Sequence, residues 1–230
     1  MNLSDIRAVV FDMDGLLVDS ERLARAALIE TAGRFGITAD LDLFTRMIGL
    51  PEDSSLALLR HRFGLDFDAE DFIRKAATAC HAMVDCGHLE LKSGATELME
   101  FLEHSGLPKA VATSSSREKA MRTLSAVDLA SKFDAIVTRT DVARGKPHPD
   151  LFLRAAFELD QPVDRCIALE DSYNGVRAAR AAGMRVIMVP DLLIATAEMD
   201  DLAELIAPDL LAVLDALMRV RVELEDTAGS

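Results

Sequence analysis

Short apolar runs alternate with helical patterns along most of this chain. Five of the runs have the length of a buried strand. They are AVVF (8–11), KAVAT (109–113), DAIVT (134–138), CIALE (166–170) and RVIMV (185–189). Helical patterns separate the last four, and within 171–183 the residues Val176, Ala179 and Ala182 recur at helical spacing. This alternation predicts an α/β fold whose core is a Rossmann-like parallel sheet.

Residues 16–91 interrupt this alternation, because their apolar positions follow helical spacing only. Leu28, Ala32 and Phe35 recur in this way, and a longer stripe runs from Phe72 to Val84. The α/β pattern resumes near residue 92. We therefore expect a discontinuous catalytic core, residues 1–15 plus 92–230, and an α-helical cap domain, residues 16–91, inserted after the first strand. That strand must then pair with strands far away in the sequence.

Composition limits the partners of this protein. Its 230 residues carry a formal net charge of −14, and an acidic surface argues against nucleic-acid or anionic-membrane binding, which need clustered Lys and Arg. Three cysteines in a chain of this length do not suggest a disulfide framework. The sequence shows neither a signal-peptide pattern nor an apolar run long enough to span a bilayer. We expect a cytoplasmic protein and favour a monomer, although the sequence leaves the oligomeric state open.

Polar residues of a restricted type follow four of the five expected strands. They are Asp12, Asp14 and Gly15 after the first, Thr113 and Ser114 after the second, Lys146 beyond the third, and Glu170 with Asp171 at the end of the fourth. Ligands of open parallel sheets bind at this edge. Carboxylates suit Mg²⁺, an ionised aspartate can attack phosphorus, and a lysine can neutralise a transferring phosphoryl group. A second carboxyl group can protonate the leaving oxygen.

The motifs FDMDGLLVDSE, VATSSS, GKPHPDLF and LEDSYNGVRAARAAGM occur in this order along the chain. In this respect the sequence resembles the haloacid dehalogenase superfamily, in its subgroup of capped phosphatases and β-phosphoglucomutases. The resemblance covers essentially the whole chain. It implies a phosphoric monoester hydrolase that acts on a small phosphorylated metabolite, such as a sugar phosphate, through an aspartyl-phosphate intermediate.

The resemblance also implies a role for each motif residue. Asp12 would be the nucleophile, and Asp14 the general acid and base. Thr113 and the amide of Ser114 would hold the phosphoryl oxygens, and Lys146 would neutralise the nucleophile and the phosphate. Mg²⁺ would be bound by Asp12, the backbone carbonyl of Asp14, Asp171 and Glu170. Gly15 beside the nucleophile and Glu21 in the cap are expected to contact the substrate.

Three features favour hydrolysis over other chemistries of this superfamily. The dehalogenases lack a second aspartate, whereas this chain has Asp14. The well-known mutases carry a histidine where Ala24 stands, and Lys and Arg around a cap-loop glycine where this chain reads MIGLPEDSS (47–55). A cap without those cations has little to hold a second phosphate group. The alternative is a β-phosphoglucomutase-like phosphohexomutase.

Readings from other functional classes remain open. A receiver-like signalling domain also surrounds an aspartyl phosphate with acidic residues, a hydroxyl and a lysine, but receivers are much shorter and have no cap. A non-catalytic protein that binds a phosphorylated ligand is disfavoured because every chemical position is filled. The segment CHAMVDCGH (80–88) invites a zinc site, but its two cysteines are spaced more widely than in most such sites, and core and surface roles explain them better.

Overall fold

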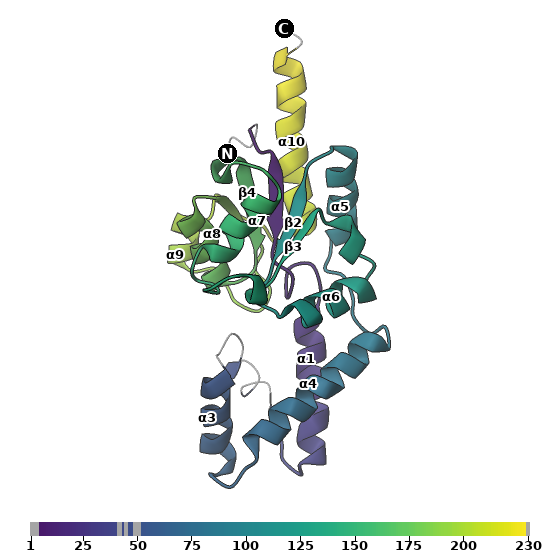
Figure 1. Ribbon diagram of the computed structural model, residues 1–230, viewed down its shortest axis with the longest axis vertical. Coiled ribbons are helices and arrows are strands. Elements are labelled where there is room, and N and C mark those ends of the chain that lie inside the picture. The colour runs from purple at the N-terminus through teal and green to yellow at the C-terminus, as the bar shows by residue number, and fades with distance from the viewer. Residues whose placement is uncertain (1–4, 41–42, 44–45, 48–51, 229–230) are drawn as a thin grey trace. The chain divides into compact units, whose positions relative to one another are not determined.

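The computed structural model describes residues 5–40, 43, 46–47 and 52–228 of the chain (Figure 1). The chain divides into two compact units. We call Met1–Asp19 together with Glu90–Ser230 the core unit, and Ser20–Leu89 the cap unit. The junctions thus lie a few residues from the boundaries expected from the sequence, which were 15/16 and 91/92.

Backbone pairing explains where the core unit ends. Val18 forms an isolated bridge with Leu91, and the amide of Asp19 donates to the carbonyl of Glu90 at 2.9 Å. The amide of Lys92 likewise donates to the carbonyl of Leu17 at 2.9 Å. These bonds tie the outgoing and returning segments to one another, so both belong with the core.

The core unit is built on one parallel sheet in the order β3-β2-β1-β4-β5-β6. Its strands are β1 (Ala8–Phe11), β2 (Lys109–Ala112), β3 (Ala135–Val137), β4 (Cys166–Glu170), β5 (Arg185–Met188) and β6 (Leu205–Ile206). The α/β prediction is confirmed, and β1 pairs with β2 and β4, both far away in the sequence. The sequence pattern missed β6, because a half-buried strand of two residues leaves no apolar run.

Helices connect and cover these strands. They are α5 (Ala95–His104), α6 (Arg117–Ala126), α7 (Asp150–Glu158), α8 (Tyr173–Ala182), α9 (Ala197–Leu202) and α10 (Leu210–Ala228), with 3-10 turns at Ala130–Lys132, Arg139–Asp141 and Val163–Arg165. Helices α7 and α8 lie on one side of the sheet, and α5 packs with α10 on the other (Figure 1). None of the described helices is long and apolar enough to cross a membrane.

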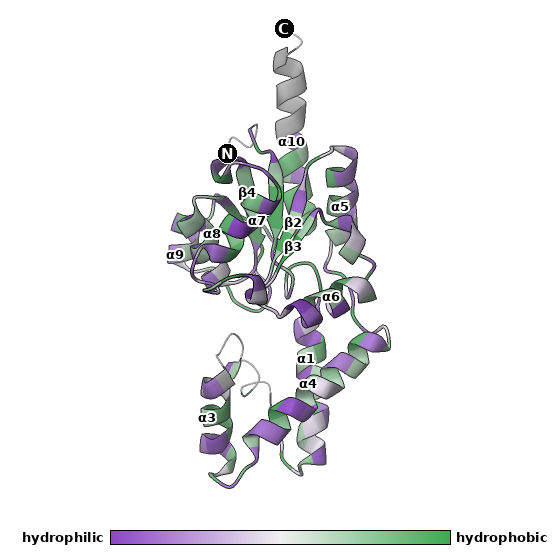
Figure 2. Ribbon diagram, in the orientation of Figure 1, coloured by the Kyte–Doolittle hydropathy of each residue, from purple (hydrophilic) through white to green (hydrophobic). Residues whose placement is uncertain are grey.

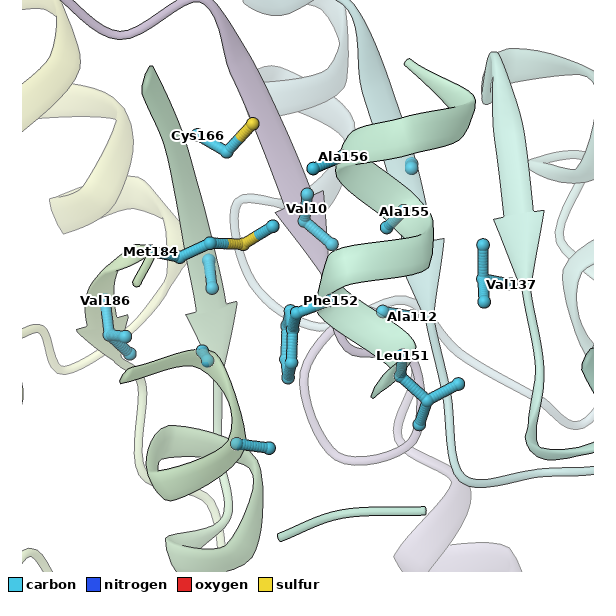
Figure 3. Packing of buried hydrophobic residues seen from close by; sticks show 14 of the residues in the cluster. Val10, Ala112, Val137, Leu151, Phe152, Ala155, Ala156, Cys166, Met184 and Val186 are labelled. Atoms are coloured by element: carbon cyan, nitrogen blue, oxygen red, sulfur yellow. The ribbon is translucent and has the colours of Figure 1, made fainter. Parts of the chain in front are cut away.

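The packing between α7 and the sheet shows why the strands are so apolar. Val10, Ala112 and Val137 come from three neighbouring strands and meet Leu151 and Phe152 of α7 (Figure 3). All five are at most 2% exposed. Because successive side chains of a strand alternate between its faces, a strand covered on both sides is apolar throughout.

The cap unit is helical in its described part, as the sequence predicts. It contains α1 (Ser20–Arg34), α3 (Glu52–Phe63) and α4 (Ala69–Asp85), each of which carries both hydrophobic and hydrophilic residues (Figure 2). Leu28, Ala32 and Phe72 belong to its own apolar cluster. Asp68 caps α4, because its carboxylate accepts from the amide of Asp71 at 2.9 Å. The cap unit therefore has a small core of its own.

Candidate active site

The strands of the core unit bring distant motifs to one edge of the sheet. Asp12 directly follows β1, and its amide donates to the carbonyl of Leu169 in β4 at 3.0 Å. Thr113 directly follows β2, and its amide donates to the carbonyl of Val137 in β3 at 3.0 Å. These bonds extend the ladders by one residue, so the polar side chains start where the buried strands stop.

A buried lysine joins two of the carboxylates. Lys146 Nζ donates to Asp12 Oδ1, and also to Glu170 Oε1 at 2.5 Å. The side chain of Lys146 is only 5% exposed, that of Asp12 9% and that of Glu170 0%. Lys146 Nζ also lies 5.2 Å from the ring centroid of Phe152. One ammonium group thus faces two carboxylates in a site that excludes most solvent.

Asp171 adds a third carboxylate. Oxygens of Asp12, Glu170 and Asp171 lie within 4.8 Å of one another, and they form the only such group of possible metal ligands among the described residues. Gly15, with a φ of +83°, makes room for Asp171, because a Cβ at that position would stand 2.4 Å from Asp171 Oδ2. Three carboxylates against one lysine leave an excess of negative charge, which fits a divalent cation bound through oxygen ligands.

The pKa values reflect this excess charge. Burial raises the pKa of Asp12 to about 7, against the attraction of Lys146. Burial and the neighbouring charges of Asp12 and Glu170 raise the pKa of Asp171 well above its ordinary value. Burial alone would lower the pKa of Lys146, but the two carboxylates outweigh it and raise that pKa. Lys146 is therefore a permanent cation, and the carboxylates need further positive charge to be fully ionised.

Asp14 faces a different set of partners. Ser115 Oγ donates to Asp14 Oδ2 at 2.7 Å, and Lys119 Nζ lies 3.2 Å from Asp14 Oδ1. Asp14 is partly exposed, and its carboxylate does not belong to the three-carboxylate group. A carboxyl group outside the metal cluster and near solvent is suited to exchanging protons with a leaving group or water.

The loop after β2 presents hydroxyl and amide groups. Thr113 is buried and Ser114 is exposed. Thr113 Oγ1 accepts from the amide of Ser115 at 3.0 Å, which orients the hydroxyl, and Ser116 caps α6. Ser115 and Lys119 were not among the site residues expected from the sequence, although Ser115 belongs to the VATSSS motif.

Glu170 is held by groups that the sequence analysis also missed. Ser172 donates to Glu170 Oε2 through both its amide, at 3.3 Å, and its hydroxyl, at 3.1 Å. Gly175 in α8 leaves the space, because a Cβ there would stand 1.9 Å from the carboxyl carbon of Glu170. The sequence signal for this glycine is its occurrence in the first turn of a helix, where glycine is unfavourable.

Comparison with known proteins agrees with this geometry. The model of the haloacid dehalogenase-like hydrolase family matches residues 9–189. The chain belongs to this family. It is 32% identical to the phosphorylated carbohydrates phosphatase of Thermotoga maritima, over 79% of this chain and 84% of that protein. It is 34% identical to (DL)-glycerol-3-phosphatase 2 of Arabidopsis thaliana, over 81% of this chain and 80% of that protein.

A solved relative shares the fold of both units. The crystal structure of a HAD family hydrolase from Deinococcus radiodurans, with bound phosphate and sodium, has a TM-score of 0.79 and 28% sequence identity to this chain. It covers 94% of this chain, and the match spans 97% of that one. These matches confirm the family resemblance inferred from the motifs. They also identify the protein as a phosphatase of this family.

Other expected features lie outside this cluster. Glu21 is on α1 in the cap unit, so its contact with substrate stays a prediction. Ala24 packs against the cap cluster, whereas Ile48 and Gly49 of the cap loop fall outside the described residues. In the zinc candidate, Cys80 is half-buried and Cys86 exposed, and neither belongs to a group of metal ligands in the part of the chain that is described.

Proposed function

We propose that this protein is a Mg²⁺-dependent phosphatase that hydrolyses a small phosphorylated metabolite, a sugar phosphate or a similar monophosphate, through an aspartyl phosphate on Asp12. The observation that carries the proposal is the buried arrangement of Asp12, Lys146 and Glu170, with Asp171 beside them. A structural ion pair would match charges, whereas this cluster has two carboxylates more than it has cations.

The first step transfers the phosphoryl group to the protein. A carboxylate oxygen of Asp12 forms a bond to phosphorus as the bond from phosphorus to the ester oxygen breaks. Asp14 gives its proton to that leaving oxygen, which departs as an alcohol. Lys146, Thr113 and the amide of Ser114 are placed to balance the charge on the phosphoryl oxygens.

The second step regenerates the site. Asp14, now a carboxylate, takes a proton from water, and the oxygen of that water forms a bond to phosphorus. The bond between phosphorus and Asp12 breaks, which releases inorganic phosphate and the free aspartate. Ser115 and Lys119 hold the Asp14 carboxylate between the two steps.

Mg²⁺ would be held by Asp12, Asp171 and the backbone carbonyl of Asp14. Glu170 would either bind the ion directly or contact the groups that bind it. A bound Mg²⁺ would supply positive charge to the phosphoryl oxygens and to the crowded carboxylates. The cation and phosphate in the Deinococcus radiodurans relative support a site of this kind. The raised pKa values of Asp12 and Asp171 express the same shortage of positive charge in the site.

The substrate class rests on the relatives and on the cap. The two relatives compared above are named for phosphorylated carbohydrates and for glycerol 3-phosphate, which are phosphate esters of small polyhydroxy compounds. Ala24 offers no acid or base, so the cap helix lacks the group that a mutase of this subgroup would use there. Hydrolysis is therefore favoured over isomerisation.

Phosphate release from a panel of phosphorylated metabolites, with and without Mg²⁺, tests this function. Asp12→Asn should abolish release, and Asp201→Asn, an exposed aspartate on α9, serves as the matched control. The panel should include β-glucose 1-phosphate with a glucose 1,6-bisphosphate primer, assayed for glucose 6-phosphate. Isomerised product without free phosphate would identify a mutase. Release that persists in Asp12→Asn would overturn the proposed mechanism.

A further inference from the structure

Asp191 brings a fifth acidic side chain to the carboxyl edge of the sheet, after Asp12, Asp14, Glu170 and Asp171. The amide of Val189, just after β5, donates to the carbonyl of Glu170 at 2.7 Å. The backbone pairing with β4 therefore continues one residue beyond the end of β5. Asp191 follows two residues later. Lys92, on the segment that returns to the core unit, donates to Asp191 Oδ1 at 2.7 Å. The mechanism above uses neither residue.

The second oxygen of Asp191 has no such partner. Asp191 Oδ2 is buried, and no described residue donates a hydrogen bond to it. The side chain as a whole is 14% exposed and that of Lys92 27%. A buried acceptor without a donor is unfavourable, and native structures commonly satisfy it with water or an ion. The unsatisfied atom therefore indicates where a further group belongs.

That oxygen lies near Asp171, one of the three clustered carboxylates. A Cβ built on Gly15 would stand 2.4 Å from Asp171 Oδ2 and 3.4 Å from Asp191 Oδ2. Oxygens of both carboxylates thus approach one point beside Gly15. Two carboxylates that approach one point repel each other, and a cation or a polarised water between them relieves this repulsion.

Open space lies next to this corner of the core unit. A pocket of about 290 Å³ is lined by residues that include Gly15, Lys92, Ser93, Val189 and Pro190. These residues flank Asp191 and the turn that makes room for Asp171. Mg²⁺ releases its hydration shell reluctantly and keeps several waters, each of which needs a hydrogen-bond acceptor.

We infer that Asp191 is a positioning residue for the active-site cation: its Oδ2 accepts a hydrogen bond from a water held by that cation, and Lys92 fixes the carboxylate in this orientation. The inference rests on the proposed function, because it requires a cation on Asp171. Groups that orient a metal's immediate ligands act on its affinity in this way. Asp191 itself makes no contact with phosphorus.

Binding of Mg²⁺ to the full-length protein, measured by isothermal titration calorimetry, tests the inference without any substrate. Asp191→Asn should raise the Mg²⁺ dissociation constant about tenfold, the lower end of the effect found for residues of this kind. Glu204→Gln is the matched control, because Glu204 also pairs with one cation, Arg185, at 2.6 Å. Arg185 begins β5, at the opposite end of the strand, so this variant should leave the constant within about twofold of wild type.

The variant Lys92→Met shows whether Lys92 affects Mg²⁺ binding by orienting Asp191 or only by its positive charge. By charge alone, removing this cation should strengthen Mg²⁺ binding, the opposite of the effect of Asp191→Asn. If Lys92 instead orients Asp191, both variants weaken binding. Asp171→Asn should remove the binding heat altogether, which assigns that heat to this site. Circular dichroism of each variant confirms that it is folded.

Two results would overturn the inference while the proposed function stands. One is an Asp191→Asn dissociation constant equal to that of Glu204→Gln. The other is tighter Mg²⁺ binding in Lys92→Met together with weaker binding in Asp191→Asn. That result would mean that Asp191 affects the cation only through its charge and does not position it. Failure of the proposed function has its own signature, since phosphate release would then not depend on Asp12.

Discussion

The two ends of the central sheet hold similar charged groups in opposite environments. At the carboxyl end, Lys146 faces Asp12 and Glu170 with almost no exposure to solvent. At the amino end of β5, Arg185 pairs with Glu204 at 2.6 Å, and the glutamate side chain is 28% exposed. Hydrogen bonds from Arg185 lower the pKa of Glu204, whereas burial raises the pKa of Asp12.

This difference separates a structural ion pair from a reactive site. A carboxylate that pairs with a cation and is partly exposed to solvent is a stable anion, and such a pair contributes little to the free energy of folding. Where carboxylates outnumber cations in a dry site, the leftover negative charge favours binding of a metal ion and an electrophile. The fold tolerates this charge because the ends of β1 and β4 and the loop of Lys146 hold the groups in place.

The largest expected effect comes from removing the nucleophile. Asp12→Asn should lower phosphate release by at least about 10⁴-fold, since single members of a catalytic unit carry effects of this size or more. The same change should stabilise the metal-free protein, because a buried carboxylate is replaced by a neutral group of equal size. Activity and thermal unfolding in EDTA give the two readouts. A variant that is both inactive and less stable would mean that Asp12 has a structural role instead.

Removing the buried cation should lower stability as well as activity. Lys146→Met leaves Asp12 and Glu170 without their partner, and breaking a buried pair in this way costs about 3–5 kcal/mol. Lys132→Met is the control, because Lys132 pairs with Glu103 at 3.0 Å with both side chains about half exposed. Urea unfolding should show a large loss for the first variant and little change for the second. Equal midpoints would contradict the contrast between the two environments.

Metal-free protein should lose stability as the pH rises from about 5 to 7. The folded state binds a proton at Asp12 with a pKa of about 7, against 3.8 for an ordinary aspartate. The folded state therefore holds more protons than the unfolded state in this window. The free energy of unfolding falls with rising pH, by up to about 1.4 kcal/mol per pH unit from Asp12. Asp171, whose pKa is also raised, adds to this fall.

Melting temperatures in EDTA across this window check the pH effect. Asp12→Asn should make the curve less steep, and added Mg²⁺ should raise the melting temperature more at pH 7 than at pH 5. Carboxylates such as Glu198, whose pKa is lowered by hydrogen bonds from Arg177, change the pH dependence of stability only at more acidic pH. Parallel curves for wild type and Asp12→Asn would rule out this account of the site.

Two helical glycines provide the smallest and most local comparison. Gly175→Ala places a Cβ about 2 Å from the carboxylate of Glu170. It should lower the free energy of unfolding by about 1–3 kcal/mol and reduce activity several-fold. Gly33→Ala, in the last turn of α1, meets nothing within 4 Å and should stabilise the protein by about 0.5–1 kcal/mol. Thermal unfolding and phosphate release on the same preparations measure both. Similar shifts in the two variants would show that Gly175 makes no special room.

The sequence alone was enough to identify the long buried strands and the edge at which the polar residues gather. Strands covered on both faces are continuous apolar runs, so β1 and β4 are visible without a structure. Asp12, Thr113 and Glu170 then follow as strand-end residues, because parallel strands end at one edge. A two-residue strand such as β6 leaves no comparable pattern.

Only the tertiary structure decided which groups touch. It showed that Lys146 joins Asp12 to Glu170, that Ser115 and Lys119 hold Asp14, and that the second oxygen of Asp191 lacks a donor. These contacts join residues up to 134 positions apart. Local propensity and periodicity report each segment separately, whereas burial, hydrogen bonding and charge balance arise only when distant segments share one space.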